Sequence, residues 1–514
     1  MKIPGHETRF SWRLIEPLVL FLCIDSCFAK QPNILLIVSE DNGPELGCYG
    51  DLYAKTPHLN RLATQGLCFL NAYVPQSGCS QSRASYLTGL YPHQHGQFGL
   101  ATWGFRLYRE DIPNLPVLLK QAGYRTGIIG KLHINPASAF PFDYKEIPNA
   151  NFQRQEMHKY VEHAKTFINA ADSPFFLSIN YPDAHDPWIR QVDGIPASPL
   201  NADAVTPMPY MGLDGPALRE LVADYYNCIS RLDTYIGELL SALAQSGKAR
   251  NTMVIYLGDH GADMLRGKRT CYESGLKIPL IVRWPGHITP GRPKDLISTI
   301  DLFPTILEAA GLTRPDNLPG KSLQPLFNNN RTLMHREYYC AEYHTHAAAS
   351  NYFPQRSIRN QQYKLILSLL PGTIHPDYED TIRKLHGDHL QRDSQHTLNI
   401  PALISQTTSR VRSAYERMRR PPEIQLYDLT NDPYEFIDLA DSLAHQSIKR
   451  TLLLELEKWR EDTSDPLLDP LSLKQLTAEV QSVTNRTIAR KHDWQYPIYF
   501  FNNIEEDIPI PQLK

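Results

Sequence analysis

The chain is short of the features that would tie it to nucleic acid or to a membrane. Its net charge is only −3 over 514 residues, so the broad basic surface that binds phosphate backbones or acidic lipids is not expected. After residue 30 no apolar run is long enough for a membrane helix. Low-complexity segments and internal repeats are also missing. What remains is an ordinary globular composition, in a chain long enough for two domains.

Cysteine is sparse and lacks the spacing of a metal knuckle. No Cys-x-x-Cys pair occurs, which argues against structural zinc. Beyond residue 29, the spacings of the remaining cysteines do not define a disulfide framework or a pairing. These cysteines are Cys48, Cys68, Cys79, Cys228, Cys271 and Cys340.

The first 29 residues predict a signal peptide. An apolar segment at residues 18–24 is followed by Cys27, Phe28 and Ala29, a possible small-residue cleavage site, and it is preceded by cations at Lys2, Arg9 and Arg13. The apolar segment is too short to span a bilayer permanently. We therefore expect a secreted or periplasmic protein, or one of a lysosome-like compartment in a eukaryote.

Short β-favouring runs alternate with helical patterns over residues 30–340. Continuous apolar runs of this kind are typical of strands that are buried on both faces. The strongest helical stripe runs from Leu218 to Leu243, with Pro216 near its start and Gly247 past its end. This alternation predicts an α/β fold with a large, mostly parallel mixed sheet sandwiched by helices. The runs lie at residues 33–38, 126–130, 175–179, 253–257 and 279–282.

The pattern changes after about residue 340. Residues 356–369 and 424–429 predict strands of a smaller antiparallel sheet, and residues 448–459 predict a helix. The last fifty residues are rich in proline and are expected to be irregular. We predict a catalytic domain at residues 30–340 and a smaller α+β domain at residues 341–514 that contributes to the substrate pocket.

Charged side chains follow the predicted strands where the strands end. Since the carboxyl ends of parallel strands meet at one edge of a sheet, these groups should lie close together. Carboxylates from distant segments suit a hard divalent cation, and the cationic groups suit a tetrahedral oxyanion. Each motif alone is equally consistent with a solvated loop, but together they predict metal-assisted hydrolysis of a sulfate or phosphate ester. The groups are Glu40, Asp41, Lys131, His133, His185, Asp259, His260 and Lys268.

A small polar loop at residues 77–80 leads into a predicted helix start. With a helix beginning near Ser80, Arg83 would fold back over the first turn, where free N–H groups and the helix dipole favour an anion. Cys79 would then be a nucleophile at an anion site. The alternative is a structural cysteine beside a surface arginine.

The order of these segments resembles the type I sulfatase family, which has an alkaline phosphatase-like fold. Cys79-Ser80-Gln81-Ser82-Arg83, followed by Leu87-Thr88-Gly89, is similar to the signature Cys-x-Pro-x-Arg with Leu-Thr-Gly, and residues 130–133 are similar to the second signature. Segments 267–273 and 426–433 are also similar to family segments. Residues 91–96, 185–187 and 352–356 most resemble the heparan N-sulfatase (N-sulfoglucosamine sulfohydrolase) branch.

The resemblance implies that a maturation enzyme, the formylglycine-generating enzyme or an equivalent, converts Cys79 to formylglycine. One hydroxyl of its hydrate would attack sulfur, and deprotonation of the other by His133 would later expel sulfate. Arg83 would hold the hydrate, Lys131 and Lys268 would neutralise the sulfate oxygens, and His185 would protonate the leaving group.

The resemblance also implies one bound Ca²⁺. Its implied ligands are Glu40, Asp41, residue 79, Asp259 and His260. This chain departs from the family pattern at three positions. Gln81 replaces the signature proline, Glu40 stands where the family usually has aspartate, and His260 stands where asparagine is common. Because imidazole is a poor Ca²⁺ ligand, His260 is also a candidate substrate contact.

The predicted substrate is a sulfated glycan, either N-sulfoglucosamine or a sugar O-sulfate. The candidates for binding the sugar ring are Glu342, His344, His346, Tyr352 and Arg356, with an ordinary loop as the alternative. Two other functions remain open. One is a phosphoester or phosphonate hydrolase of the same superfamily. The other is a catalytically silent glycan-binding protein, if Gln81 blocks the maturation of Cys79.

Overall fold

The computed structural model describes Met1, residues 31–149, 154–328, 334–376, 378 and 398–504. Residues Gln31–Lys514 form one compact unit. The predicted signal peptide, apart from Met1, lies outside the described residues and stays a prediction. Within the described ranges, none of the helices combines the length and apolar character needed to cross a bilayer.

A mixed, mostly parallel sheet forms the centre of the fold, as the sequence predicts. Its strand order is β4-β3-β5-β1-β6-β7-β2-β8 among the described residues. β7 runs antiparallel to both of its neighbours, and the other pairings are parallel. The strands are β1 (Asn33–Ser39), β2 (Leu67–Tyr73), β3 (Arg125–Gly130), β4 (Tyr144–Glu146), β5 (Phe175–Tyr181), β6 (Thr252–Gly258), β7 (Lys277–Arg283) and β8 (Leu296–Ser298).

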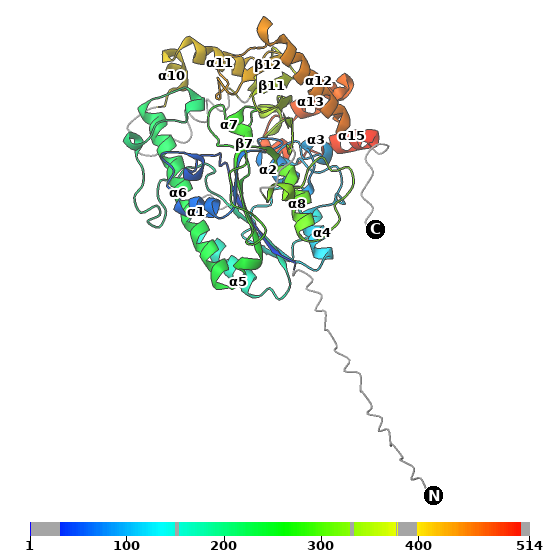
Figure 1. The fold of residues 1–514 in the computed structure, drawn as a ribbon. Coiled ribbons are helices and arrows are strands. Elements are labelled where there is room, and N and C mark those ends of the chain that lie inside the picture. Colours follow the sequence, from blue (N-terminus) through cyan, green and yellow to red (C-terminus); the bar gives the residue numbers. More distant parts are fainter. Residues whose placement is uncertain (2–30, 150–153, 329–333, 377, 379–397, 505–514) are drawn as a thin grey trace. The chain divides into compact units, whose positions relative to one another are not determined.

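Helices cover both faces of this sheet (Figure 1). Alternate residues of β1 belong to two cores, since successive side chains of a strand point to opposite faces. Leu35 and Ile37 belong to the core with α1 (Pro57–Thr64), α5 (Met157–Asn169) and α6 (Pro216–Gln245). Leu36 belongs to the other core with α2 (Cys79–Thr88), α4 (Leu115–Gln121) and α8 (Leu302–Ala309). The short helices α3 (Pro92–His95) and α7 (Glu273–Leu276) lie in the connecting segments.

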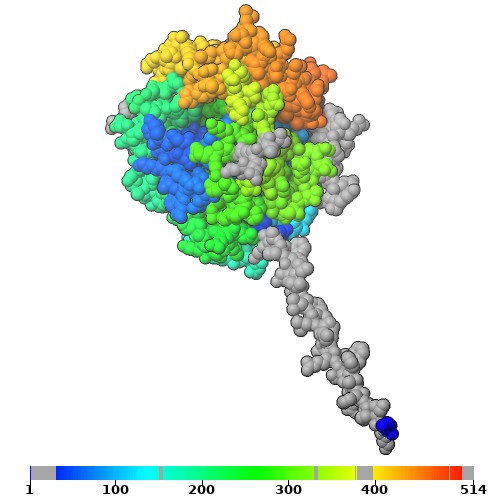
Figure 2. All heavy atoms as spheres, in the orientation of Figure 1, coloured from blue at the N-terminus to red at the C-terminus, as the bar shows by residue number. Residues whose placement is uncertain are grey.

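A second sheet begins at Tyr339, close to the predicted domain boundary. It is antiparallel, with the order β12-β11-β10-β9, which confirms the predicted fold class. α12 (Gln446–Asp462) packs Leu452 and Leu456 against it. In the space-filling view the residues near 400–500, yellow to orange, gather at one end of the face shown (Figure 2). The strands are β9 (Tyr339–Tyr343), β10 (Gln355–Arg359), β11 (Tyr363–Ser368) and β12 (Ile424–Asp428).

The prediction that the last fifty residues are irregular is wrong, because much of this segment is helical. Pro470 stands at the first position of α13, where a proline is tolerated, and the Asp469 side chain caps that helix. Trp494, Tyr496 and Phe500 then pack into a small aromatic core with Phe98. Prolines therefore start helices here instead of excluding them. The C-terminal helices are α10 (Ile400–Gln406), α11 (Ser409–Arg419), α13 (Pro470–Ser482), α14 (Arg486–Ala489) and α15 (Tyr496–Ile504).

Candidate active site

Cys79 is the first residue of α2, one residue earlier than the helix start expected from the sequence. Gly78 caps the helix in an extended conformation, and Gly89 ends it in the left-handed region that glycine adopts without strain. The Cys79 side chain is 1% exposed. The thiol therefore lies at the positive end of a helix whose first N–H groups lack intrahelical partners, as an anion site requires.

The carboxyl ends of β1 and β6 bring the predicted metal ligands together. Ser39 pairs with Gly258, so the acids that follow each strand are neighbours. The Asp41 N–H donates to Asp259 Oδ1 at 2.9 Å. His260 Nε2 lies 3.3 Å from Cys79 Sγ and 3.2 Å from Asp41 Oδ1. One potential ligand atom from each of Asp41, Cys79, Asp259 and His260 lies within 4.8 Å of the others. We call this group the strand-end site.

Glu40 stands at the edge of the strand-end site. Its Oε2 accepts a hydrogen bond from Lys131 Nζ at 2.9 Å. Its Oε1 is buried and has no hydrogen-bond partner among the described residues. A buried carboxylate oxygen left unsatisfied is costly. Glu40 Oε1 and the carboxylate oxygens of Asp41 and Asp259 together make a donor set that fits a hard cation such as Ca²⁺.

His260 fits such a cation less well and carries charge itself. Its Nδ1 lies 2.9 Å from the Gly261 carbonyl, which leaves Nε2 facing the thiol. Burial disfavours the imidazolium, but Asp259 and Asp41 outweigh burial and raise the pKa of His260 to about 9. A charged imidazolium beside Cys79 can hold an anionic group, so its geometry agrees with either of the roles considered from the sequence.

Three further cations, Arg83, Lys131 and Lys268, interact electrostatically with the thiol. Arg83 donates to Asp259 Oδ2 at 3.0 Å, to Asn180 Oδ1 at 2.7 Å and to the Lys131 carbonyl at 2.9 Å. Lys268 Nζ donates to Asp41 Oδ2 at 2.8 Å. Asn180, at the end of β5, was missed by the sequence analysis. Its position one residue after the apolar run 175–179 was the available signal.

His133 and His185 lie on two further loops at the same edge of the sheet. His133 has φ 61°, a strained conformation for a side chain of this size, and its Nδ1 is buried without a partner in the described ranges. Burial and then Lys131 lower its pKa well below the ordinary value. His185 Nε2 lies 4.0 Å from Asp41 Oδ2, and burial is the largest cause lowering its pKa. Both imidazoles are therefore neutral near neutral pH.

Four of the five residues predicted to bind the sugar ring, all except His346, are buried and bonded to protein groups. Glu342 accepts from His93 Nδ1 at 2.9 Å and from His344 Nε2 at 3.2 Å. Arg356 NH2 donates to Asp465 Oδ1 at 2.7 Å and lies 3.5 Å from Glu342. Each of the four side chains is at most 3% exposed. We call His93, Glu342, His344, Arg356, Arg460 and Asp465 the Arg356 network.

Tyr352, the last of these four buried candidates, belongs to the C-terminal aromatic core. Its hydroxyl lies 3.0 Å from Thr477 Oγ1 on α13. This position favours a packing role over a direct sugar contact. The direct contact predicted for Glu342, His344, Tyr352 and Arg356 stays a prediction.

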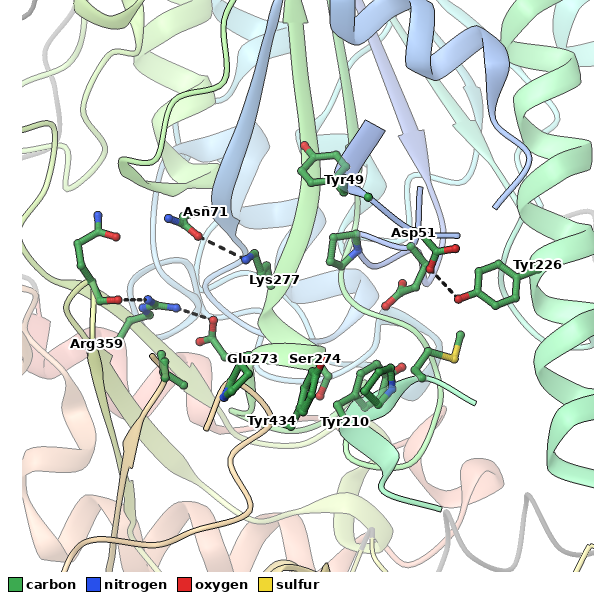
Figure 3. Close-up of a pocket in the computed structure, with 18 residues that line it drawn as sticks. Tyr49, Asp51, Asn71, Tyr210, Tyr226, Glu273, Ser274, Lys277, Arg359 and Tyr434 are labelled. Atoms are coloured by element: carbon green, nitrogen blue, oxygen red, sulfur yellow. Dashed lines mark hydrogen bonds and ion pairs between the residues drawn. The ribbon is translucent and has the colours of Figure 1, made fainter. Parts of the chain in front are cut away.

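A separate cavity of about 460 Å³ opens beside β7, between the main sheet and the second sheet (Figure 3). Tyr210, Tyr226 and Tyr434 line it, together with the ion pair between Glu273 and Arg359. Among its described lining residues there is none of the predicted site residues. The cavity is thus distinct from the strand-end site.

Comparison with known families gives two matches. The family model described as Sulfatase matches residues 32–312. The one described as N-sulphoglucosamine sulphohydrolase, C-terminal, matches residues 258–371. The first covers the segments that form the strand-end site, and the second covers β9 and β10.

Curated relatives and solved structures agree with these matches. Human N-sulphoglucosamine sulphohydrolase is 30% identical, over 87% of this chain and 93% of the relative. An ulvan-active sulfatase of Formosa agariphila is 29% identical, over 86% of this chain and 82% of the relative. A structure of a protein complexed with its substrate D-glucosamine-2-N,6-O-disulfate shares the fold, with a TM-score of 0.62 and 20% identity over 85% of this chain and 99% of that one.

A structure described as a 2-O GAG sulfatase aligns with a TM-score of 0.65 and 21% identity, over 86% of this chain and 96% of that one. At this identity the likeness concerns the fold alone. The matched family model, the human relative and the residues gathered around Cys79 lead to one conclusion. The chain belongs to the sulfatase family of hydrolases.

Proposed function

We propose that the protein removes sulfate from a sulfated glycan, N-sulfoglucosamine or a sugar O-sulfate, through matured residue 79 and a bound Ca²⁺. The observation that carries this proposal is the position of Cys79 at the start of α2, with His260 Nε2 only 3.3 Å from its sulfur. The substrates named for relatives, glucosamine sulfates and ulvan, support the glycan class. Export to a secreted, periplasmic or lysosome-like compartment belongs to the same proposal and rests on the N-terminal sequence pattern.

Residue 79 supplies the nucleophile. Conversion of Cys79 to formylglycine by a maturation enzyme would give it a hydrate with two hydroxyls, one for attack on sulfur and one for release of sulfate. Arg83 is held by three acceptors, so its guanidinium is fixed beside residue 79 and orients it. The net reaction consumes one water and releases sulfate and the sugar hydroxyl or amine.

The cations bind the sulfate group. Lys131 is positioned by Glu40, and Lys268 by Asp41 with Asp263 3.8 Å away. An ammonium group has three N–H donors, so these lysines can also donate to sulfate oxygens. Glu40, Asp41 and Asp259 would hold Ca²⁺, which supplies Lewis-acid polarisation of the sulfate when bound. Because these groups are buried, their electrostatic attraction for an anion is stronger than it would be in water.

Two histidines move protons. His133 has a lowered pKa and a buried Nδ1 without a hydrogen-bond partner among the described residues, so it can accept the proton of the second hydroxyl. His185, on the loop after β5, has Nδ1 2.6 Å from the Asp186 carbonyl, so it would act as an acid in its imidazolium form and donate the Nε2 proton to the departing sugar atom. Its neighbour Asp41, 4.0 Å away, favours this protonated form.

The test uses the protein coexpressed with a formylglycine-generating enzyme. Mass spectrometry of the peptide containing residue 79 should show the loss expected for conversion of thiol to aldehyde. The matured protein should then release sulfate from glucosamine N-sulfate or a sugar O-sulfate, and matched aryl sulfates should react faster than aryl phosphates. Faster phosphate release would indicate a phosphoester hydrolase. An intact thiol in the native host, with no sulfate release, would indicate a silent glycan-binding protein.

A further inference from the structure

Gln81 is the residue at which this chain departs from the family signature, and its side chain is fully buried. Its Nε2 donates to the Phe98 carbonyl at 2.9 Å and to the Thr345 carbonyl at 2.8 Å. Gln76 Nε2 approaches the same carbonyls only at 3.4 and 3.5 Å. One amide therefore joins the nucleophile helix α2 to two distant segments, the loop after α3 and the loop after β9.

The loop after β9 is held from several sides. The His344 ring packs on Phe98 with centroids 4.3 Å apart. The His346 carbonyl accepts from the Leu100 N–H at 3.1 Å. Gln81 adds two short hydrogen bonds, which connect α2 to the carbonyls of Phe98 and Thr345. Its loss would leave two buried carbonyls without a short donor.

His346 follows Thr345, the residue that Gln81 holds, and is the partly exposed histidine of this loop. Its Nδ1 has no hydrogen-bond partner within the described chain. Burial, followed by the charges of Lys268 and Arg269, lowers its pKa well below the ordinary value and favours the neutral ring. A neutral imidazole offers one nitrogen that can accept a hydrogen bond from a sugar hydroxyl.

We propose that Gln81 is a positioning residue that anchors the 344–346 loop to the nucleophile helix, so that His346 contacts the sugar ring bearing the sulfate. This inference rests on the proposed function. It explains why a glutamine stands at the signature proline. Proline would be compatible with the first turn of α2, where an intrahelical N–H bond is not required, but it has no amide to hold the loop.

The experiment compares Gln81→Met, Gln81→Pro and the wild type after maturation, with rates normalised to the formylglycine content measured by mass spectrometry. Normalisation separates loop anchoring from the efficiency of maturation. Both variants should raise KM for the sulfated saccharide about 10-fold, and KM for a small aryl sulfate without a sugar ring should change by less than about two-fold. Gln76→Met, which removes only the two longer contacts, is the matched control and should change saccharide KM by less than about two-fold.

A double-mutant cycle tests the link to His346. His346→Ala should raise saccharide KM by a similar factor, and adding it to Gln81→Met should cause little further increase, because both changes remove the same contact. Independent of turnover, hydrogen exchange at residues 344–346 and at Leu100 should accelerate in Gln81→Met and not in Gln76→Met.

An unchanged saccharide KM in both Gln81 variants would overturn the inference, as would full additivity with His346→Ala or unchanged hydrogen exchange. A rise in formylglycine yield in Gln81→Pro with normal KM would show that the glutamine does not position substrate. If the fully matured wild type released no sulfate from any substrate, the proposed function would fail instead. The hydrogen-exchange comparison would still decide whether Gln81 anchors the loop.

Discussion

The strand-end site and the Arg356 network are two buried clusters of charge with opposite character. In the Arg356 network, both oxygens of Asp465 accept hydrogen bonds from Arg356, and Arg460 and the Leu467 N–H complete the set. Both oxygens of Glu342 also accept hydrogen bonds. At the strand-end site, Glu40 Oε1 has no hydrogen-bond partner among the described residues and only Arg83 NH2 at 3.7 Å, and a thiol lies beside an imidazolium.

The difference separates charge that holds the fold from charge that is kept for a ligand. Burying a carboxylate is expensive unless its lone pairs are satisfied. The Arg356 network satisfies the carboxylate oxygens of Glu342 and Asp465 internally. The strand-end site leaves donors and acceptors open, and this is where an anion and a cation would bind. From the sequence the two clusters could not be told apart, because both consist of charged residues.

The largest effect should come from the nucleophile. Cys79→Ala should lower kcat by roughly 10⁴-fold or more, because residue 79 forms the bond to sulfur. Its unfolding midpoint in urea should match that of the wild type, since a small buried side chain is replaced by another. Residual turnover near the wild-type level would refute the assignment of residue 79.

The next effect tests the Arg356 network. Arg356→Met should lower the free energy of unfolding by about 3–5 kcal/mol, because it removes a buried cation that donates two hydrogen bonds to Asp465 and lies 3.5 Å from Glu342. Urea denaturation measures this loss. Lys458→Met, which breaks an exposed ion pair with Asp462, is the control and should leave the unfolding midpoint unchanged. If Arg356→Met kept full stability and raised only KM, the sugar-contact interpretation of Arg356 would be correct.

Metal binding sharpens the same comparison. Ca²⁺ at 100 times its Kd should stabilise the folded state by about 2.7 kcal/mol, and a chelator should remove both this gain and the sulfatase activity. Glu40→Gln should reduce the gain, because it replaces a carboxylate in the donor set. Glu45→Gln, five residues away and lining the separate cavity, should retain it. Thermal unfolding with and without Ca²⁺ is the measurement, and an equal gain in both variants would exclude Glu40 from the site.

The smallest effect concerns pH. His95, on α3, accepts the Gln97 N–H at Nδ1, and burial is the largest cause lowering its pKa to about 3. Since the unfolded pKa is near 6.5, the unfolded state binds more protons below that pH, and stability falls as pH decreases through the window from 6.5 to 3. Between pH 7 and 5 this single group should cost about 2 kcal/mol.

Urea unfolding at pH 7 and pH 5 measures that loss. His95→Gln should flatten the dependence relative to the wild type, whereas His158→Gln, at an exposed position of α5, should not. An identical pH slope in the wild type and His95→Gln would show that His95 is not the responsible group.

The hydrophobic pattern of the sequence was enough to predict the buried strands with continuous apolar runs and the helix with an apolar stripe. The five apolar runs became β1, β3, β5, β6 and β7, and the stripe from Leu218 to Leu243 lies within α6. Their positions also predicted which charged groups follow strand ends. β2, β4 and β8 were missed, and the antiparallel direction of β7 was not predicted. The β2 and β7 pairing includes a register shift between Phe69 and Ala72, which breaks strict alternation along the strand.

The sequence by itself determined the chemical inventory of this protein: a cysteine before a helix, acids after two strands, and cations after others. Only the tertiary structure decided which charges are satisfied. The sequence could not show that Asp465, 109 residues away, accepts hydrogen bonds from two nitrogens of Arg356. Gln81 looked only like a lost proline until its amide was found on Phe98 and Thr345. Hydrogen-bond satisfaction depends on partners remote in the chain, and a local pattern carries no information about them.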